Sequence, residues 1–190
     1  MLEKIPRGVG EALSNVKAGI EKTAWHADFA DVPATITVTS EAFADDGAIP
    51  ARFTADGPGL SPPLSWTGVP EHAAAVVLLV EDPDAPAINP LVHLIAWNLL
   101  PGDVSLPEGD ITGPAGEGSL HDLGTNSFQK DAWLPPDPPT GHGIHHYLFQ
   151  VFALDRTAPV PASPGRGALV EAIKGHVIAK GLLTGTYARV

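Results

Sequence analysis

The amino-acid sequence predicts a mainly β fold with helices at its periphery, and three observations support this prediction. Glycine and proline each occur 20 times in 190 residues, which disfavours a helical bundle and favours short strands joined by turns. Segments 75–80, 91–100 and 147–154 are nearly continuous apolar runs of strand length. Hydrophobic residues make up 44% of the chain and charged residues only 17%, so the chain is able to bury a substantial core.

The first predicted element is an amphipathic helix over residues 6–22. Its narrow apolar stripe is typical of a helix docked on its own domain or on a partner subunit, which would allow a homodimer. A regulatory or membrane-surface arm is the alternative, which the mixed charge of the segment disfavours. We expect residues 1–34 to form a helical extension and residues 35–190 the main domain. The stripe consists of Leu2, Ile5, Val9, Leu13, Val16 and Ile20.

The elements that follow are strands, with one more helix near the end. Segment 35–39 alternates polar and apolar residues, which predicts a strand with one solvated face, and the three apolar runs predict buried strands. Apolar residues between 169 and 178 predict a second helix over 167–180, with Gly181 placed to end it. Residues 182–190 are expected to form a last strand or turn.

The charge of the chain excludes several classes of function. Its 22 acidic and 11 basic residues give a net charge of −11, and no lysine or arginine occurs between Phe53 and Gln129. Binding to nucleic acid or to an anionic membrane needs a basic surface, so both are excluded. Because cysteine is absent, disulfide and thiolate chemistry are excluded too. No transmembrane segment or secretory signal is predicted, and we expect a cytoplasmic protein.

Three polar clusters interrupt the apolar pattern: the acidic turn at 81–86, His93 inside an apolar strand, and the histidine-rich segment 141–147. Each has an ordinary structural explanation, either a solvated surface turn or a core histidine with a satisfied hydrogen bond. Alternation along a strand places His145 and Tyr147 on one face and His146 on the other. A metal site could recruit His93 and His145 with Asp82 or Asp84, but no spaced metal motif supports it, and we expect no metal.

The clusters fit one known family when they are taken together. The sequence DPDAP at 82–86, LVHL at 91–94 and GIHHY at 143–147 resemble the phosphatidylethanolamine-binding protein (PEBP) family, in particular its bacterial Raf-kinase-inhibitor-like branch. Shorter matches, such as SPPLSW at 61–66 and PPTG at 138–141, occur in the same order. The resemblance extends from about residue 42 to residue 190.

This resemblance implies an antiparallel β-sandwich with a small pocket at one end that binds anions such as phosphate or a phospholipid headgroup. The family has no general catalytic activity or cofactor, and some of its members inhibit kinases or serine proteases. Asp84 is expected to form the turn rather than contact the ligand. By position, the resemblance implies these pocket residues: Asp82, Ala85, His93, Pro138, Pro139, His145 and Tyr147.

Two imidazoles, a phenol and backbone N–H groups are suitable donors to an anion. Asp82 close to either histidine would favour its protonated form, which is needed because no lysine or arginine lies nearby in sequence. Asp137 stands where the family usually has a small residue, and we expect its charge at the rim to weaken phosphate binding at neutral pH. Leu94 replaces a tryptophan of the family, and Trp97 or Trp133 is expected to fill that volume.

The sequence therefore predicts a non-enzymatic protein that binds a small anionic or polar ligand and regulates a partner protein, such as a kinase or a protease. The alternative is a hydrolase in which His93 and His145 act as acid and base while Asp82 orients one of them. No nucleophile elbow or glycine-rich phosphate loop of the common types is present in the sequence.

Overall fold

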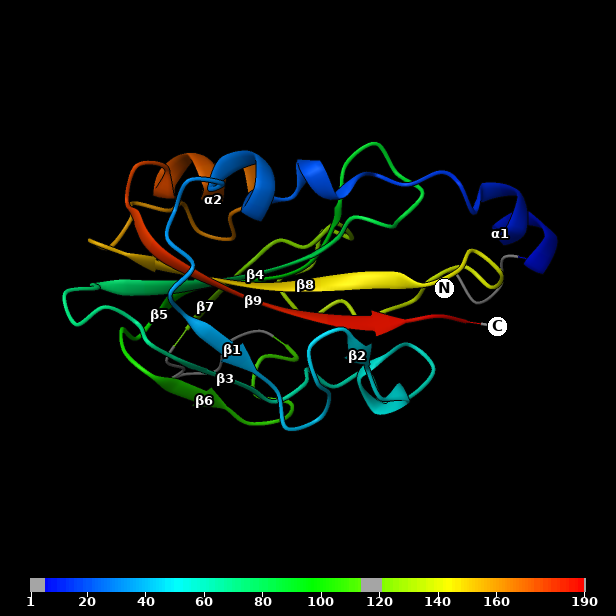
Figure 1. Cartoon of the computed structure of the whole chain (residues 1–190), viewed down its shortest axis with the longest axis horizontal. Helices are drawn as coiled ribbons and strands as arrows, with labels where there is room; N and C mark the ends of the chain where they lie inside the picture. Colours follow the sequence, from blue (N-terminus) through cyan, green and yellow to red (C-terminus); the bar gives the residue numbers. More distant parts are fainter. Residues whose placement is uncertain (1–5, 114–120, 190) are drawn as a thin grey trace.

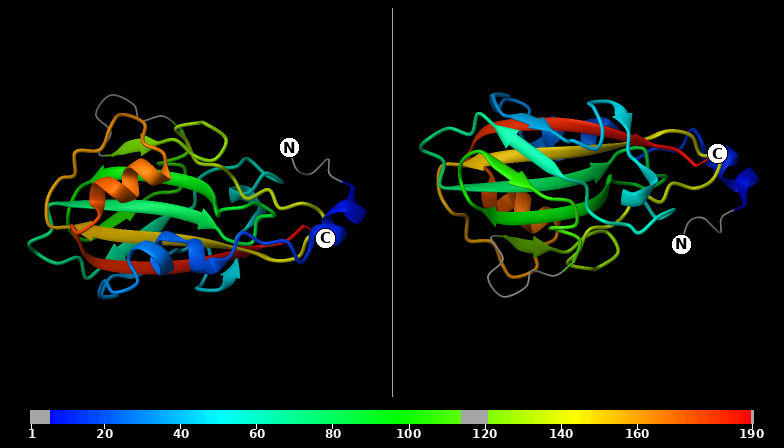
Figure 2. Two further views of the ribbon diagram at one scale, coloured as in Figure 1. Left: turned by 90° about the horizontal axis from the view of Figure 1, so that it is seen from above. Right: turned by 90° about the horizontal axis from the view of Figure 1, so that it is seen from below.

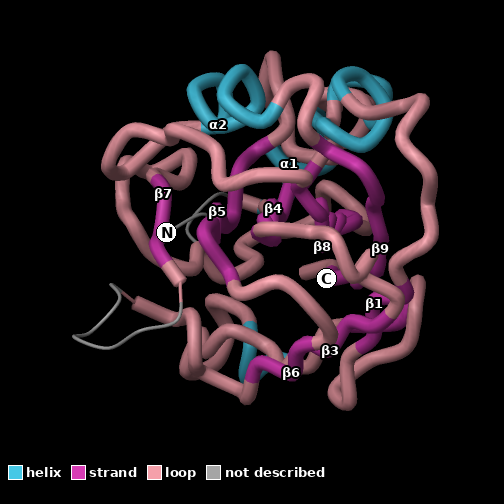
Figure 3. Tube along the Cα trace, turned by 90° about the vertical axis from the view of Figure 1, so that its left-hand side faces the viewer, coloured by secondary structure: helices cyan, strands magenta, loops and turns pink. Residues whose placement is uncertain are grey.

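The structure, a computed structural model, describes residues 6–113 and 121–189 and contains two stacked β-sheets. Figures 1 and 3 show the smaller sheet lying beneath the larger one, with the helices above. All strand pairs are antiparallel except β2 with β9. The predicted mainly β sandwich with peripheral helices is confirmed. The smaller sheet has the strand order β1 (Thr37–Thr39), β3 (Leu64–Thr67) and β6 (Val104–Leu106). The larger sheet has the strand order β2 (Gly47–Ala48), β9 (Val177–Tyr187), β8 (His145–Leu154), β4 (Ala75–Asp82), β5 (Leu91–Leu99) and β7 (Asp122–Gly124).

Both faces of the larger sheet are covered. On the inner face, Val76 and Leu78 of β4 pack with Trp66 of the smaller sheet. On the outer face, Val77 of β4 packs with Leu169 of helix α2 (Arg166–Ile173). This double burial explains why the three long strands appear in the sequence as continuous apolar runs rather than as alternating patterns.

The predicted N-terminal helix over 6–22 is wrong in length. Helix α1 spans only Arg7–Leu13, and the chain then continues to a 3-10 turn at Ile20–Lys22 and a π-helical turn at Ala24–Asp28. The backbone N–H groups of Ala18 and Gly19 donate to the carbonyls of Ala85 and Pro83, at 3.0 Å each. These hydrogen bonds to the acidic turn replace the hydrogen bonds of a continuing helix. Gly19 also has φ +107°, which is outside the helical region. Leu2 and Ile5 of the predicted stripe lie outside the described residues.

The predicted C-terminal helix over 167–180 is present but shorter than predicted. Helix α2 ends at Ile173, and residues 177–180 belong to β9, where Val177 pairs with Leu154. Gly181 lies inside this strand, and a Cβ there would come within 2.5 Å of the Ile36 carbonyl oxygen. Gly181 therefore permits a close approach of two backbones and does not end a helix. A short β-branched apolar run fits either period, and pairing with β8 decides the outcome.

Residues 24–30 pack against the outer face of the larger sheet and are held there by hydrogen bonds to buried polar side chains. The Lys180 ammonium donates to the carbonyls of Trp25, Phe29 and Ala30 at 3.2, 2.7 and 3.2 Å. The Gln150 amide oxygen accepts the Trp25 N–H at 2.7 Å. The rings of Phe29 and Phe152 lie 4.9 Å apart. This part of the predicted extension is therefore packed against the sheet, as Figure 2 shows from above.

Candidate functional site

Three neighbouring strands bring the predicted site residues to one end of the larger sheet. Asp82 is the last residue of β4, which pairs with β5 on one side and with β8 on the other. His93 lies near the start of β5, and His145 and Tyr147 lie at the start of β8. Because both pairings are antiparallel, the end of β4 meets the beginnings of its two neighbours, and the four side chains converge.

One small pocket is lined by Asp82, Ala85, His93, Pro138, Pro139 and His145. Its volume is about 310 Å³, which includes the open solvent at its mouth. Tyr147 is not among the lining residues, but its ring meets the His93 ring edge-on with centroids 5.0 Å apart. The structure thus brings all seven sequence-predicted residues together. It also places Asp137 in the pocket wall.

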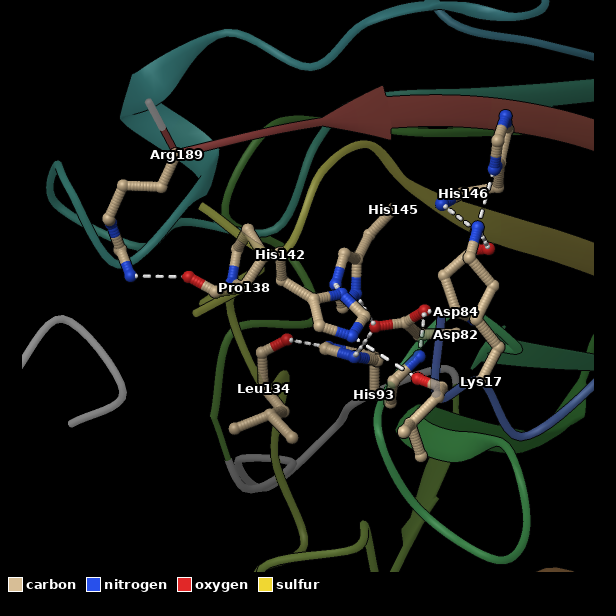
Figure 4. Close-up of polar contacts among 12 residues, drawn as sticks. Lys17, Asp82, Asp84, His93, Leu134, Pro138, His142, His145, His146 and Arg189 are labelled. Carbon is tan, nitrogen blue, oxygen red and sulfur yellow. Dashed lines mark hydrogen bonds and ion pairs between the residues drawn. The ribbon is translucent and has the colours of Figure 1, made fainter. Parts of the chain in front are cut away.

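Asp82 is the central acceptor of this cluster. Its Oδ1 accepts the backbone N–H groups of Asp84 and Ala85 at 2.8 and 3.1 Å, which closes the acidic turn. Its Oδ2 accepts a hydrogen bond from His145 Nδ1 at 2.7 Å and lies 3.9 Å from His93 Nε2. One carboxylate therefore both stabilises the turn and orients His145 (Figure 4).

His93 and Tyr147 each present a polar atom that has no partner among the described residues: His93 Nε2 and the Tyr147 hydroxyl. His93 Nδ1 lies 2.6 Å from the Leu134 carbonyl oxygen, which only accepts, so Nδ1 carries a hydrogen. Burial lowers the pKa of His93, against the opposing effect of Asp82. At pH 7 the ring is therefore neutral, with a lone pair on Nε2. Burial also raises the pKa of Tyr147 well above its usual value, so the hydroxyl keeps its proton.

His142, whose direction the sequence does not reveal, extends the chain of hydrogen bonds. Its Nδ1 lies 2.8 Å from His145 Nε2, and its Nε2 lies 3.2 Å from the Val16 carbonyl oxygen. The chain of contacts therefore runs from Asp82 through His145 and His142 to the Val16 carbonyl of the N-terminal segment.

Arg189 supplies a positive charge that the local sequence lacks. Its Nη1 donates to Asp137 Oδ1 and to the Pro138 carbonyl, both at 2.8 Å, and its Nε and Nη2 donate to Asp56. The Asp137 carboxylate at the pocket is thus paired rather than bare. Of the two tryptophans considered for the neighbouring volume, Trp133 lies 6.2 Å from the His93 ring. Trp97 instead packs at the outer face of the sheet.

Asp84 faces the N-terminal segment instead of lining the pocket. Its Oδ1 accepts Lys17 Nζ at 2.6 Å, and its Oδ2 accepts the backbone N–H and Nδ1 of His146 at 2.8 and 2.6 Å. We call residues 7–19 the N-terminal arm. The arm lies along the acidic turn, where Lys17 pairs with Asp84, and its Val16 carbonyl contacts His142 (Figure 4).

Gly10→Ala is expected to detach the N-terminal arm. A Cβ on Gly10 would lie 2.0 Å from the Thr140 carbonyl oxygen, although alanine favours a helix over glycine by about 1 kcal/mol. We expect limited proteolysis within the arm to speed up by roughly tenfold or more, since opening of the docked state becomes easier. Gly8→Ala is the matched control, because its Cβ meets nothing within 4 Å. Equal cleavage of the two variants would contradict a docked arm.

The contribution of Asp84 to stability is expected to depend on pH. Burial alone would raise the pKa of Asp84, but hydrogen bonds from Lys17 and His146 hold it below its usual value. The ionised form therefore stabilises the fold above a pH of about 4, and this stabilisation is lost as pH falls through the lower folded-state pKa. Urea unfolding should show Asp84→Asn about 1–2 kcal/mol less stable at pH 6 and nearly equal to the parent below pH ~3. A difference that does not change with pH would contradict this assignment.

A wider, open groove lies over the smaller sheet, with a volume of about 1110 Å³ that includes open solvent. Two pairs of its polar side chains bond to each other: Arg52 pairs with Glu108, and Ser65 Oγ donates to Ser105 Oγ at 3.0 Å. None of the unpartnered buried polar atoms found in the described residues lines it. The chemistry therefore favours the smaller pocket. Residues 6–113 and 121–189 contain no group of three or more histidine and carboxylate side chains arranged to hold a metal ion.

Two stacked sheets with a His–Asp–Tyr pocket at one end define a class of β-sandwich proteins with a polar end pocket. The family model described as phosphatidylethanolamine-binding protein matches residues 39–188. The chain belongs to the phosphatidylethanolamine-binding protein family.

Known relatives agree with this assignment. A UPF0098 protein of Pyrococcus abyssi is 40% identical over 151 residues, which cover 79% of this chain and 84% of the relative. A crystal structure described as a PEBP homolog from Chlamydia trachomatis has a TM-score of 0.74 at 35% identity, covering 82% of this chain and 99% of the other. Escherichia coli YbcL, described as a member of the mammalian PEBP family, has a TM-score of 0.75 at 27% identity, covering 83% and 100%. None of these names states an enzymatic activity.

Of the helices that the structure describes, none is long and apolar enough to cross a membrane.

Proposed function

We propose that this chain is a non-enzymatic binding protein that takes a small anionic or polar ligand into the pocket at the end of β4, β5 and β8. The observation that carries the proposal is the pair of buried, unpartnered polar atoms, His93 Nε2 and the Tyr147 hydroxyl. Leaving such an atom without a hydrogen bond costs about 1–3 kcal/mol. A ligand that bonds to both atoms removes that cost, which supports binding at this place. The proposed ligand contacts are those expected from the sequence: Asp82, Ala85, His93, Pro138, Pro139, His145 and Tyr147.

Titration calorimetry with inorganic phosphate, acetate and phosphoethanolamine between pH 5.5 and 8 tests this proposal. We expect binding to the parent protein, weakened by roughly tenfold in Tyr147→Phe, which removes only the hydroxyl. Ser105→Ala is the control, since it removes a hydroxyl from the wider groove and should leave binding unchanged. Absence of heat with every compound, or a loss that falls on Ser105→Ala instead, would overturn the proposal.

The free Nε2 of His93 also favours a second candidate, a hydrolase that uses this nitrogen as a general base with His145 as the acid. Turnover of any ester, phosphoester or amide that disappears in His93→Asn would establish it. A parent protein that binds ligands but turns over no member of such a panel would leave the binding function alone. A regulatory role through a kinase or protease partner rests on the family resemblance, and a pull-down with the purified chain tests it.

A further inference from the structure

We propose that the main domain carries a docking site for an extended, lysine-bearing segment of a partner protein, and that the N-terminal arm covers this site with its own residues 16–19. The contacts in question are those of the arm and not those of a ligand in the pocket, so the inference stands apart from the proposed function. The docking site consists of the residues that bond to residues 16–19: Pro83, Asp84, Ala85 and His142.

The arm is an addition to the family domain rather than a part of it. The family model begins at residue 39, after the arm, and its range includes the whole docking site. The match to the Chlamydia trachomatis homolog covers 99% of that chain with 82% of this one, which leaves almost none of that chain to form a comparable arm. The docking site is therefore built from the domain itself, and the arm is one occupant of it.

The contacts of residues 16–19 are made mostly by backbone atoms. The N–H groups of Ala18 and Gly19 donate to carbonyl oxygens of the acidic turn at 3.0 Å each. The Val16 carbonyl oxygen lies 3.2 Å from His142 Nε2, whereas the Val16 side chain is exposed. Main-chain hydrogen bonds are available to any extended segment, so this part of the recognition selects a backbone conformation rather than a sequence.

Three features of the segment restrict which sequences fit. Lys17 Nζ donates to Asp84 Oδ1 at 2.6 Å (Figure 4). Ala18 is only 2% exposed, so a larger side chain at that place has to displace its neighbours. Gly19 has φ +107°, which residues with a side chain rarely adopt. A partner segment therefore needs a lysine, a small residue and a glycine in consecutive positions.

The charge of the surface favours a basic segment. Asp84 accepts the backbone N–H and Nδ1 of His146 through Oδ2, which leaves Oδ1 directed at the arm. The chain has a net charge of −11, and no lysine or arginine occurs between Phe53 and Gln129. The ammonium group opposite Oδ1 therefore comes from the arm or from a partner that replaces it. An acidic surface also attracts such a segment before contact.

The arm is held weakly enough to be exchanged. Helix α1 has seven residues, and an isolated helix of that length is marginal in water. Its apolar Val9 and its Arg7–Glu11 ion pair are both exposed. The Lys17 side chain is half-exposed, and ion pairs near the surface contribute up to about 1 kcal/mol. Release of the arm thus needs less free energy than unfolding of the core.

Fluorescence anisotropy with a labelled peptide of residues 13–22, LSNVKAGIEK, measures occupation of the site in trans on the full chain. We expect weak binding to the parent chain, because its own arm competes at a high effective concentration. Lys17→Glu in the chain opposes Asp84 and releases the arm, so the peptide should bind at least about tenfold more tightly. Lys174→Glu is the matched control, since it makes the same change of charge on an exposed lysine after α2 and should bind as the parent does.

Changes in the peptide test the restrictions on its sequence. With the Lys17→Glu chain as receptor, the peptide changes Lys17→Glu and Gly19→Ala should each weaken binding by roughly tenfold. The first replaces an ion pair by a repulsion, and the second forces a side chain into a backbone conformation that favours glycine. The peptide change Val16→Ala should alter the affinity by less than about twofold, because that side chain is exposed.

A second pair of chain variants places the peptide at the acidic turn. Lys17→Glu combined with Asp84→Asn should bind the peptide at least about fivefold more weakly than Lys17→Glu alone, since the charge that faces the peptide lysine is gone. Lys17→Glu combined with Glu41→Ala removes an exposed carboxylate elsewhere and should bind as Lys17→Glu does. Urea unfolding curves establish that each variant is folded.

Three results would overturn the inference. The first is a peptide affinity that is equal for the parent and the Lys17→Glu chains, or absent in both, which would mean that the arm covers no such site. The second is binding that ignores the peptide changes Lys17→Glu and Gly19→Ala. The third is a parent dimer that Lys17→Glu converts to a monomer, which would make the arm of a second copy the occupant. Phosphate binding is measured separately, so each of these results leaves the proposed pocket function standing.

Discussion

Replacing Glu81 by alanine is expected to lower the free energy of unfolding by about 3–5 kcal/mol. The change leaves the buried donors of Ala24 and Gln150 without an acceptor and removes one of the two carboxylates that pair with Arg166. Glu81 is fully buried at the end of β4. Its Oε1 accepts Arg166 Nε at 2.6 Å, and its Oε2 accepts the Ala24 N–H and the Gln150 amide at 2.7 and 2.9 Å. One carboxylate thus joins α2, the sheet and the π-helical turn. Urea unfolding monitored by tryptophan fluorescence measures the loss.

Two further variants separate the causes of that loss. Glu81→Gln keeps an acceptor oxygen but no charge, so it should be destabilised less than Glu81→Ala. Glu41→Ala removes an exposed carboxylate and is expected to change stability by less than about 0.5 kcal/mol. Equal stability of Glu81→Ala and Glu41→Ala would show that the buried network contributes nothing.

Replacing Asp82 by alanine is expected to have the largest effect on the pocket. The variant loses the acceptor for Asp84 N–H, Ala85 N–H and His145 Nδ1–H. We expect about 3–5 kcal/mol of lost stability and no measurable binding of phosphate, since each buried donor left unpaired costs roughly 1–3 kcal/mol. Unfolding curves and calorimetry on the same preparation measure both effects.

Asp82→Asn keeps the experiment informative if the alanine variant does not fold. Its amide oxygen is able to accept the two N–H groups of the turn, whereas its NH₂ group opposes the His145 N–H. We therefore expect a folded protein with weakened ligand binding. Asp84→Asn changes the neighbouring acid outside the pocket and should bind as the parent does. Unimpaired phosphate binding by Asp82→Asn and Asp82→Ala would remove Asp82 from the site.

The adjacent acids Glu81 and Asp82 show how much of the site follows from local sequence. Successive residues of a strand face opposite sides of the sheet. Glu81 accordingly holds the turn on the outer face, and Asp82 closes the pocket at the inner side. The same alternation correctly separated His146 from His145 and Tyr147. The separation of His146 from His145 and Tyr147 was predicted correctly because it depends only on the period of a strand.

Other features depended on contacts between distant segments and were missed. The arm is not a continuous helix, because backbone groups of Ala18 and Gly19 bond to the acidic turn more than 60 residues away. Residues 177–180 belong to a strand because β8 lies beside them. Arg189 reaches Asp137 across 52 residues, and His142 reaches Val16 across 126. No local sequence pattern encodes contacts between residues that lie this far apart along the chain.

By itself, the sequence determined the β class and the buried strands, because strand period and burial are local properties. The expected pocket residues came from the resemblance of their motifs to a known family. Only the tertiary structure decided which atoms of those residues remain free. The tautomer of His93 follows from Leu134, and the contacts of His142 with His145 and with the Val16 carbonyl depend on how the N-terminal arm docks. Hydrogen-bond direction is set by the partner opposite each atom, and that partner is known only when the chain has folded.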